Sequence, residues 1–554
     1  MTQREIEQAM QIAVQNQQAG KLGEAELIYR QILAGQPNHA NALHLLGAIA
    51  IQVGRLDAGI ELIRRAIAID PAIAEYHSNL SVALRQKGQL DEAISSCREA
   101  LRLQGDYADA HYNLSVALFD KKRFEESIAA TRHVLRLKPD LAEAHNNLGD
   151  ALYLTGQIDQ AVAAYEQAIR LKPGLSDTRL KLGNIYRETD RLDDAIAAYS
   201  GAIQSRPDWA EAHNDLANVL GEKGQIDEAI AACRQAIRLK PDFVGAHLNL
   251  AGKLLLQGNF QQGWPEYEWR WRAEDSQLLG RKLAQPQWDG RELKGQTILI
   301  HAEQGIGDFI QFVRYVPLVA RRGGRVLLFC SRDVIPLLKH FPDIAQVLTG
   351  SPLPKFDTHC PLVSLPLAFQ TRLDSIPASI PYLNPDPARV ETWQQKLGPA
   401  GGELRVSLTW AGNPVFKGDR TRSLTLERLA PLGAMRDVRF YALQRGPAAE
   451  QAKSPPPGLE LANLGPELND IGDTAAVMSL MDLIITTDTS VPHLAGALGR
   501  PVWLMLQFAP DFRWLLERED SPWYPTMRLF RQKSPGDWNG VIGRVAEALG
   551  AYRV

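Results

Sequence analysis

Asp308 stands at a point in the sequence where several features favour chemistry. The apolar run Ile298–Ile300 predicts a buried strand and the pattern over residues 309–319 predicts a helix, so Asp308 lies between them. Open α/β sheets bind ligands where strands end and helices begin. A carboxylate there can accept the proton of an attacking hydroxyl group, or it can simply cap the helix. The preceding turn, which we expect to be an active-site loop, contains Gln304, Gly305 and Gly307.

A second candidate ligand site lies in residues 488–499, directly after the apolar strand Leu483–Thr487. Free backbone N–H groups at the start of the following helix would bind phosphate well. An ordinary capped helix explains the serine, the proline and the closing glycine of this segment. It does not explain an aspartate and a histidine at the same end. The candidate binding residues are Asp488, Thr489, Ser490 and His493.

The loop after the predicted strand Val406–Trp410 carries three cations within six residues. Such a loop suits a diphosphate group, with a solvated basic loop as the alternative. The sequence has no dinucleotide fingerprint, no phosphate loop ending in Gly-Lys-Ser/Thr, and no Asp-x-Asp pair placed to hold a metal-bound diphosphate. We therefore expect a nucleotide-diphosphate site that uses neither metal nor cofactor. Its candidate residues are Gly412, Lys417, Arg420 and Arg422.

Alternating strand and helix patterns surround these residues from Thr297 onward. A proline-rich segment, residues 375–387, divides them into two series. This layout predicts two Rossmann-like lobes, joined by a stiff crossing, with a cleft between them. The predicted strands are Ile298–Ala302, Val326–Cys330, Ala345–Leu348, Val406–Trp410, Val438–Leu443, Leu483–Thr487 and Val502–Leu506, and the predicted helices of the first series are Phe309–Val319 and Asp333–His340.

Composition excludes several classes of protein. The 554 residues include 61 Lys and Arg against 64 Asp and Glu, so no strong field favours nucleic acid. The four cysteines form no CxxC pair, which argues against a disulfide framework and a thiolate zinc site. The start lacks the apolar core of a signal peptide and no apolar run approaches membrane-spanning length. We expect a soluble, cytoplasmic protein that inserts into no membrane.

The first half of the chain repeats with a period of 34 residues. Each period predicts a helix, a glycine turn, a second helix and a terminating proline. One lattice consists of Pro37, Pro71, Pro139, Pro173, Pro207 and Pro241, with Gly105 at the missing point; the other consists of Gly20, Gly54, Gly88, Gly156, Gly224 and Gly258, with Lys122 and Asp190 in the gaps. This pattern resembles the tetratricopeptide repeat, over about eight units. Cys97 and Cys233 recur in phase with tyrosines, so we interpret them as packing residues.

A column of asparagines recurs on the first helix of the repeats. Such side chains can hydrogen-bond the backbone of an extended peptide whatever its sequence, or they can merely cap or solvate each helix. The column resembles the asparagine ladder in the repeats of O-linked N-acetylglucosamine transferases, which favours peptide capture. The candidate acceptor-binding residues are Asn79, Asn113, Asn147 and Asn249, with Asp215 in the same phase.

Three aromatic residues share one helical face in the last unit. Trp264, Tyr267 and Trp271 lie at i, i+3 and i+7. We interpret them as a seam with the next domain rather than as a ligand site. The domain boundaries that follow are a repeat array over residues 1–275, a linker over 276–295, an acceptor-side lobe over 296–390 and a nucleotide-sugar lobe over 391–554.

The second half resembles the heptosyltransferase-related branch of the GT-B glycosyltransferases. The resemblance rests on the motifs 305–308 and 488–501 and covers roughly residues 296–545. It implies that Asp308 acts as general base, that Asp488, Thr489 and the following helix hold the donor, and that a lysine of the middle loop meets the diphosphate. Lys417 is followed by a glycine where the family has an aromatic residue, so either Lys417 or Arg420 is the candidate for that role.

The fusion of repeats to this fold is similar to bacterial flagellin and other protein glycosyltransferases. We therefore expect a sugar transferase that uses a nucleotide-sugar donor and a Ser or Thr hydroxyl of a protein held by the repeats, with flagellin as one candidate. One alternative is a transferase that acts on a glycan or lipopolysaccharide. The other is a repeat scaffold without catalytic activity, against which the intact Asp308 and Asp488 argue.

Overall fold

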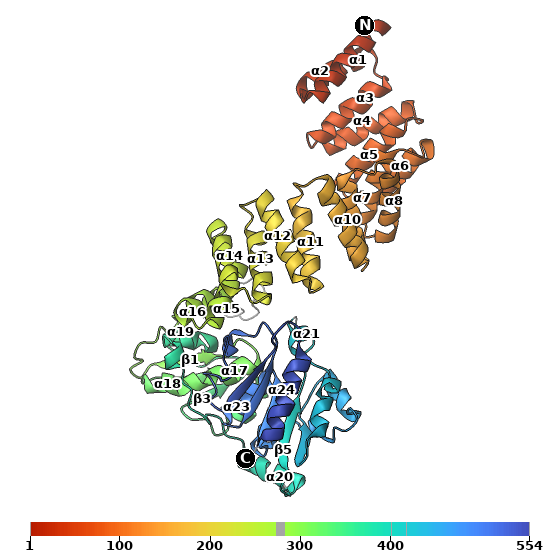
Figure 1. Cartoon of the computed structure of the whole chain (residues 1–554). Coiled ribbons are helices and arrows are strands. Elements are labelled where there is room, and N and C mark those ends of the chain that lie inside the picture. Colours follow the sequence, from red (N-terminus) through yellow and green to blue (C-terminus); the bar gives the residue numbers. More distant parts are fainter. Residues whose placement is uncertain (1, 273–282, 400, 417, 553–554) are drawn as a thin grey trace. The chain divides into compact units, whose positions relative to one another are not determined.

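The structure is a computed structural model that describes residues 2–272, 283–399, 401–416 and 418–552 (Figure 1). Lys417 and residues 276–282 of the predicted linker lie outside the described residues. The chain forms two compact units, residues 1–208 and 209–554.

The first unit consists of helical hairpins (Figure 1). Within each hairpin, small residues on the first helix allow the second to approach closely. A Cβ atom on Gly149, for example, would lie 2.6 Å from the ring of Tyr165. The helices are α1 (Gln3–Gln18), α2 (Leu22–Gly35), α3 (Ala40–Gln52), α4 (Leu56–Ile69), α5 (Ala74–Gln86), α6 (Leu90–Leu103), α7 (Ala108–Asp120), α8 (Phe124–Leu137), α9 (Ala142–Leu154), α10 (Ile158–Leu171), α11 (Ser176–Glu188) and α12 (Leu192–Ser205).

The turns between paired helices use a left-handed residue. The glycines of the 34-residue lattice all have positive φ there, for example 81° at Gly54. Lys122 and Asp190, which fill the gaps in the lattice, adopt the same conformation with φ of 61° and 58°. The predicted helix-turn-helix repeat is therefore confirmed, and the two gaps change the residue type without changing the turn.

The second unit begins with two more hairpins, α13 (Ala210–Glu222) with α14 (Ile226–Leu239) and α15 (Val244–Leu256) with α16 (Phe260–Tyr267), followed by the 3₁₀ helix η1 (Glu268–Arg272). The aromatic face of the last hairpin packs onto the rest of the unit. The ring of Trp264 lies 6.1 Å from that of Phe312 and 5.8 Å from that of Phe512, while Trp271 lies 6.2 Å from His301. The predicted seam is confirmed.

A parallel sheet of order β3-β2-β1-β4 follows among the described residues. Its strands are β1 (Thr297–His301), β2 (Arg325–Phe329), β3 (Gln346–Leu348) and β4 (Thr358–Pro361). The accompanying helices are α17 (Ile306–Phe312), η3 (Val313–Tyr315), α18 (Val316–Arg321), η4 (Arg332–Leu337), η5 (Leu362–Ser364), α19 (Leu365–Ala368) and η6 (Leu373–Ser375).

The second parallel sheet has the order β10-β9-β8-β5-β6-β7. Trp410, Ile485 and Trp538 belong to its core, in which α24 packs against the sheet. The strands are β5 (Leu404–Thr409), β6 (Val438–Ala442), β7 (Leu461–Asn463), β8 (Leu483–Thr487), β9 (Val502–Leu506) and β10 (Met527–Arg531); the helices are α20 (Pro387–Leu397), α21 (Asp419–Arg422), η7 (Leu426–Ala434), η8 (Pro447–Lys453), η9 (Gly465–Glu467), α22 (Ile471–Ser479), α23 (Ser490–Ala497), η10 (Phe512–Trp514) and α24 (Trp538–Ala551).

The predicted fold class, helical repeats followed by two α/β lobes, is confirmed, with local differences. The helix predicted over Phe309–Val319 begins earlier, at Ile306, and is divided into α17, η3 and α18. Pro317 contributes to that division because it has no N–H to donate to the preceding turn. The helix predicted over Asp333–His340 is the shorter η4, which contains Pro336.

Candidate functional site

The two motifs predicted to bind ligands meet in the structure, although they belong to different sheets. The first turn of α17, which follows β1, contains Gly307, on which a Cβ atom would lie 3.1 Å from Cδ2 of His493 and 3.6 Å from Cα of Ser490. A side chain at position 307 would press against His493, so the glycine favours this close approach of helices α17 and α23. The carboxyl ends of β1 and β8 therefore contribute to one site, as the fold class predicts.

Asp308 lies at the third position of α17, whose N-cap residue is Gly305. Its carboxylate forms an ion pair with Arg513, and its side chain is 20% exposed. Burial raises the pKa of Asp308 above its ordinary value, because the loss of hydration outweighs the opposing influence of the Arg513 guanidinium. Asp308 is thus a partly buried carboxylate held by one cation.

Arg513 was not among the residues predicted from sequence. It lies on η10, in the loop after β9, and also pairs with Asp511 at 2.7 Å. Its Nε donates a hydrogen bond to Oε1 of Gln311 at 2.7 Å. The signal that could have found it is its place beyond the carboxyl end of β9, which neighbours β8 in the same sheet.

The start of α23 holds the other predicted acidic residue. Thr489 is the N-cap residue, and its Oγ1 accepts a hydrogen bond from the N–H of Val491 at 3.2 Å. Asp488, just before it, is buried. Burial and the neighbouring Asp511 raise the pKa of Asp488 to about 7, against the influence of Trp514, Arg513 and Arg422.

His493 is buried on the inner side of the same helix. Its Nδ1 lies 3.0 Å from the hydroxyl of Tyr524, and its ring stacks on Trp514 with centroids 5.2 Å apart. Burial and the charge of Arg513 lower the pKa of His493 well below its ordinary value, so the ring is neutral. The structure places His493 where it holds α23 against the Gly307 turn, and its predicted contact with a donor stays a prediction.

The basic loop follows β5, which pairs with β8 on the other side from β9. Gly412 donates its N–H to Oγ of Ser423 at 2.9 Å, and a Cβ atom on Gly412 would lie 2.4 Å from Oδ1 of Asp419. Arg422 donates to that same oxygen at 3.1 Å and lies over the ring of Phe416 at 4.6 Å. Arg420 is exposed. The loops that end β5, β8 and β9 therefore border one edge of the sheet.

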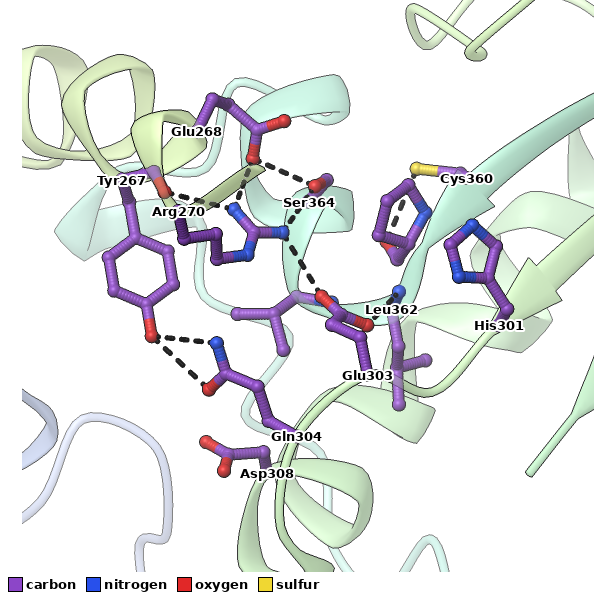
Figure 2. Close-up of polar contacts among 12 residues, drawn as sticks. Tyr267, Glu268, Arg270, His301, Glu303, Gln304, Asp308, Cys360, Leu362 and Ser364 are labelled. Carbon is purple, nitrogen blue, oxygen red and sulfur yellow. Dashed lines mark hydrogen bonds and ion pairs between the residues drawn. The ribbon is translucent and has the colours of Figure 1, made fainter. Parts of the chain in front are cut away.

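The loop before α17 joins this site to the last repeat (Figure 2). Gln304 is exposed, and its Nε2 and Oε1 lie 3.0 and 3.2 Å from the hydroxyl of Tyr267. Glu303 is buried and receives the N–H groups of Leu362 and Val363 at 3.0 and 3.1 Å. It also pairs with Arg270 of η1 at 3.0 Å.

Glu303 and His359 are two further side chains that could act as a base in place of Asp308. Both oxygens of Glu303 accept hydrogen bonds, so its side chain links η1 to the residues that follow β4. Burial raises its pKa to about 7 despite Arg270. His359 lies on β4 with Nδ1 3.2 Å from Nε2 of His301. Of the three, Asp308 alone lies on the α17 turn that contacts α23.

The asparagine column forms links between successive repeats. Each Nδ2 lies within hydrogen-bond distance of a residue that precedes its asparagine by 35 positions. These side chains are half-buried. Each amide nitrogen therefore already has a structural partner, so a bound peptide would share these side chains with the contacts between repeats. The links join Asn79 to His44 at 2.8 Å, Asn113 to Ser78 at 3.0 Å, Asn147 to Tyr112 at 3.2 Å and Asn249 to Asn214 at 2.8 Å.

Within the described ranges, the structure contains no group of three or more His, Cys, Asp or Glu residues that could hold a metal ion. All four cysteines are buried and free, which agrees with the interpretation of Cys97 and Cys233 as packing residues. Among the same residues, every helix is too short or too polar to cross a membrane.

Comparison with protein families divides the chain in the same way. Tetratricopeptide-repeat profiles match residues 17–81, 82–121, 116–156, 142–175, 180–242 and 214–267. The profile of glycosyltransferase family 9 (heptosyltransferase) matches residues 437–503, which include the Asp488 segment. The resemblance to tetratricopeptide repeats is thereby confirmed, and the resemblance to heptosyltransferase-related glycosyltransferases is confirmed over residues 437–503. The chain combines tetratricopeptide repeats with a glycosyltransferase domain.

Comparison with individual proteins gives more distant relatives. The chain is 28% identical to Protein FlbA of Caulobacter vibrioides over 320 residues, and this region is 53% of each protein. The chain thus spans about half the length of this curated relative. Among solved structures, MamA (25% identity, TM-score 0.28) matches over 29% of this chain and 95% of its own. YrrB, a TPR protein with an unusual peptide-binding site (21% identity, TM-score 0.31), matches over 33% of this chain and 95% of its own.

Proposed function

We propose that this protein transfers a sugar from a nucleotide-sugar to a Ser or Thr hydroxyl of a protein acceptor that the repeats hold, with flagellin as one candidate acceptor. The observation that carries the proposal is that the helical turn bearing Asp308 lies against the start of α23, where Gly307 closely approaches Ser490 and His493. A proton acceptor and a phosphate-binding helix start, brought together at the ends of strands, are what transfer to a hydroxyl requires.

In the proposed reaction, the acceptor hydroxyl attacks the anomeric carbon of the donor sugar while Asp308 takes its proton. The bond from that carbon to the diphosphate oxygen breaks, and the nucleoside diphosphate leaves with the additional negative charge. The start of α23 and the cations of the basic loop would offset this charge. Candidate residues for this role are Lys417, Arg420, Arg422 and Ser490.

Asp308 must be ionised to accept a proton, and Arg513 bears on that state. The ion pair favours the charged carboxylate, whereas burial opposes it. Asp308 must also turn one oxygen toward the acceptor. We expect Arg513, which has Asp511 as a second partner, to release Asp308 for this step.

The experiment that tests the proposal compares cells with and without this chain. Mass spectrometry of proteins that co-purify with it would detect sugar-sized mass increments on Ser or Thr residues, present only in the first sample. Purified protein is then incubated with a panel of nucleotide-sugars to identify the donor. Increments found on glycans or lipopolysaccharide but on no protein would contradict the proposed acceptor class.

A further inference from the structure

The last repeat differs from the others at one tyrosine. Tyrosines recur at one position of the second helices, and in the described repeats before the last their hydroxyls donate within their own hairpin. The bonds run from Tyr29 to Gln17 at 3.1 Å, from Tyr165 to Asp150 at 2.6 Å and from Tyr199 to Asn184 at 2.6 Å. The hydroxyl of Tyr267 instead leaves its hairpin and meets Gln304, in the turn that ends at Asp308.

The sequence explains why Tyr267 lacks the internal partner. Tyr165 and Tyr199 each donate to a polar residue 15 positions earlier. The corresponding residue of the last repeat is Gly252, which has no side chain to accept the bond. One position before that acceptor, Tyr165 and Tyr199 pack on glycines whose Cβ atoms would come within 2.6 and 2.7 Å of their rings. The last repeat has Ala251 there, which leaves less room for the ring. Tyr29 also faces an alanine, Ala13, but it bonds to Gln17, 12 positions earlier, where the last repeat has the apolar Leu255.

The ring of Tyr267 is held firmly in its different position. It lies 6.2 Å from Trp264 and 6.1 Å from Phe512, and the guanidinium of Arg270 lies 5.0 Å from its centroid. Arg270 is in turn fixed by the buried Glu303. Because these contacts restrain the ring of Tyr267, its hydroxyl has a defined position and orients the side-chain amide of Gln304.

Gln304 is the group that this arrangement presents. Figure 2 shows it between Tyr267 and Asp308, and its side chain is exposed. A side-chain amide offers two donor hydrogens and an acceptor oxygen, and a single hydroxyl occupies only part of that capacity. The remaining N–H and the remaining lone pair of the oxygen can pair with a peptide backbone, which offers one donor and one acceptor per residue.

We infer that Gln304 binds the backbone of the acceptor peptide beside Asp308, and that Tyr267 of the last repeat is the positioning residue that orients its amide. The inference rests on the proposed transfer to a protein. It makes the final repeat a part of the acceptor site, where it sets the position of the acceptor residue relative to Asp308.

The test measures transfer to a pool of short synthetic peptides, each with a central Ser or Thr, at saturating donor. Tyr267→Phe keeps the ring and removes only the hydroxyl, while Gln304→Ala removes the amide. Each should raise KM for the peptide pool about five- to tenfold, the value of one hydrogen bond, with kcat nearly unchanged. Because both act through one amide, the double variant should be little worse than Gln304→Ala alone.

Tyr199→Phe is the matched control, since Tyr199 occupies the same repeat position but bonds within its own hairpin. Its KM should equal that of the wild type. A Tyr267→Phe variant with unchanged KM, or one whose only defect is a lower melting temperature, would overturn the inference and leave the proposed function standing.

A second set of variants gives the last repeat the environment of Tyr199. Ala251→Gly with Gly252→Asn supplies both the space and the acceptor, so the Tyr267 hydroxyl should bond internally and KM should rise as in Tyr267→Phe. Gly252→Ala is the control, because a Cβ atom there meets nothing within 4 Å. Peptide binding measured by fluorescence anisotropy without donor should follow the same order. Equal binding by all variants would contradict the inference even if no transfer to peptides occurs.

Discussion

Asp308 and Arg513 form an ion pair between residues 205 positions apart in the sequence, and Arg513 keeps Asp511 as a second carboxylate partner. One cation therefore connects the turn after β1 to the loop after β9. The pair holds a carboxylate that burial alone would favour in its protonated form. This relationship makes the predicted base sensitive to changes in either lobe.

Asp308→Asn should reduce sugar transfer by roughly two to four orders of magnitude, because the amide cannot accept the acceptor proton. Arg513 retains Asp511, and an asparagine suits the first turn of α17, so melting temperature and donor affinity should stay nearly unaltered. Single-turnover transfer, calorimetry with donor and thermal unfolding check these three quantities. Transfer at a near wild-type rate would assign Asp308 a structural role and direct the search to His359 or Glu303.

Arg513→Gln should change the pH dependence of transfer. A nearby cation lowers the pKa of a carboxyl group, so its removal should raise the pKa of Asp308 further above its ordinary value. The ascending limb of kcat against pH should therefore move to higher pH, with activity partly recovered in alkaline buffer. Arg528→Gln, at a half-exposed surface position, is the control. An unshifted limb would show that Arg513 does not control the ionisation of Asp308.

Lys417→Ala combined with Arg420→Ala should weaken donor affinity by about 1 to 3 kcal/mol, the value of charge-assisted hydrogen bonds to a diphosphate. Arg422→Ala should weaken donor affinity and also disturb the loop, because Arg422 pairs with Asp419 and packs on Phe416. Calorimetric titration with donor measures the affinity of each variant. A chelator should leave the titration unchanged, and a requirement for a divalent metal would contradict the predicted metal-free site.

Asn113→Ala with Asn147→Ala should weaken acceptor binding and also lower stability by about 1 kcal/mol per lost link. Ser78→Ala separates the two effects, because it removes the partner of Asn113 and leaves the asparagine in place. It should therefore lower the melting temperature without comparable loss of acceptor affinity. If Ser78→Ala and Asn113→Ala weaken acceptor binding equally, the column acts only through repeat packing.

Glu303 should make stability depend on pH. Burial raises its pKa from 4.5 to about 7, so between these values the folded protein holds a proton that the unfolded chain has released. The stability of the wild type relative to Glu303→Gln should thus fall as pH rises from about 4.5 to about 7, and stay level outside that window. Tryptophan fluorescence during urea unfolding reports on this half, since ten of the eleven tryptophans lie at or after Trp264. A relative stability that rises with pH would contradict the assignment.

Much of the fold could be predicted because it depends on local pattern. The repeat turns follow from the glycine and proline lattices, and strands such as Leu483–Thr487 are continuous apolar runs. The strands that were missed have weaker signals. β4 contains His359 and ends in a proline, β7 has only three residues, and β10 carries Arg528 and Arg531. Their place in the sheets is set by the neighbouring strand rather than by their own composition.

The candidate site could be predicted only in its separate pieces. Asp308 and the Asp488 segment each stand at the end of an apolar run, so local pattern identifies them. Arg513 and Tyr267 owe their roles to contacts over long sequence separations. Tyr267 also shares its repeat position with tyrosines whose hydroxyls bond within their own hairpins, and the glycine that replaces the polar partner of Tyr165 and Tyr199 lies 15 residues earlier.

The contacts of Tyr267 and Arg270 with the loop after β1 restrict where recombination can exchange repeats without disturbing that loop. Recombination that exchanged the whole repeat array at residue 275 would separate the loop after β1 from the side chains that contact Gln304 and Glu303. An exchange before residue 209, at the boundary between the two compact units, would keep them together. Chimeric enzymes with foreign arrays should therefore retain residues 209–272 of the parent, and acceptor choice can be altered upstream of that joint without rebuilding the active site.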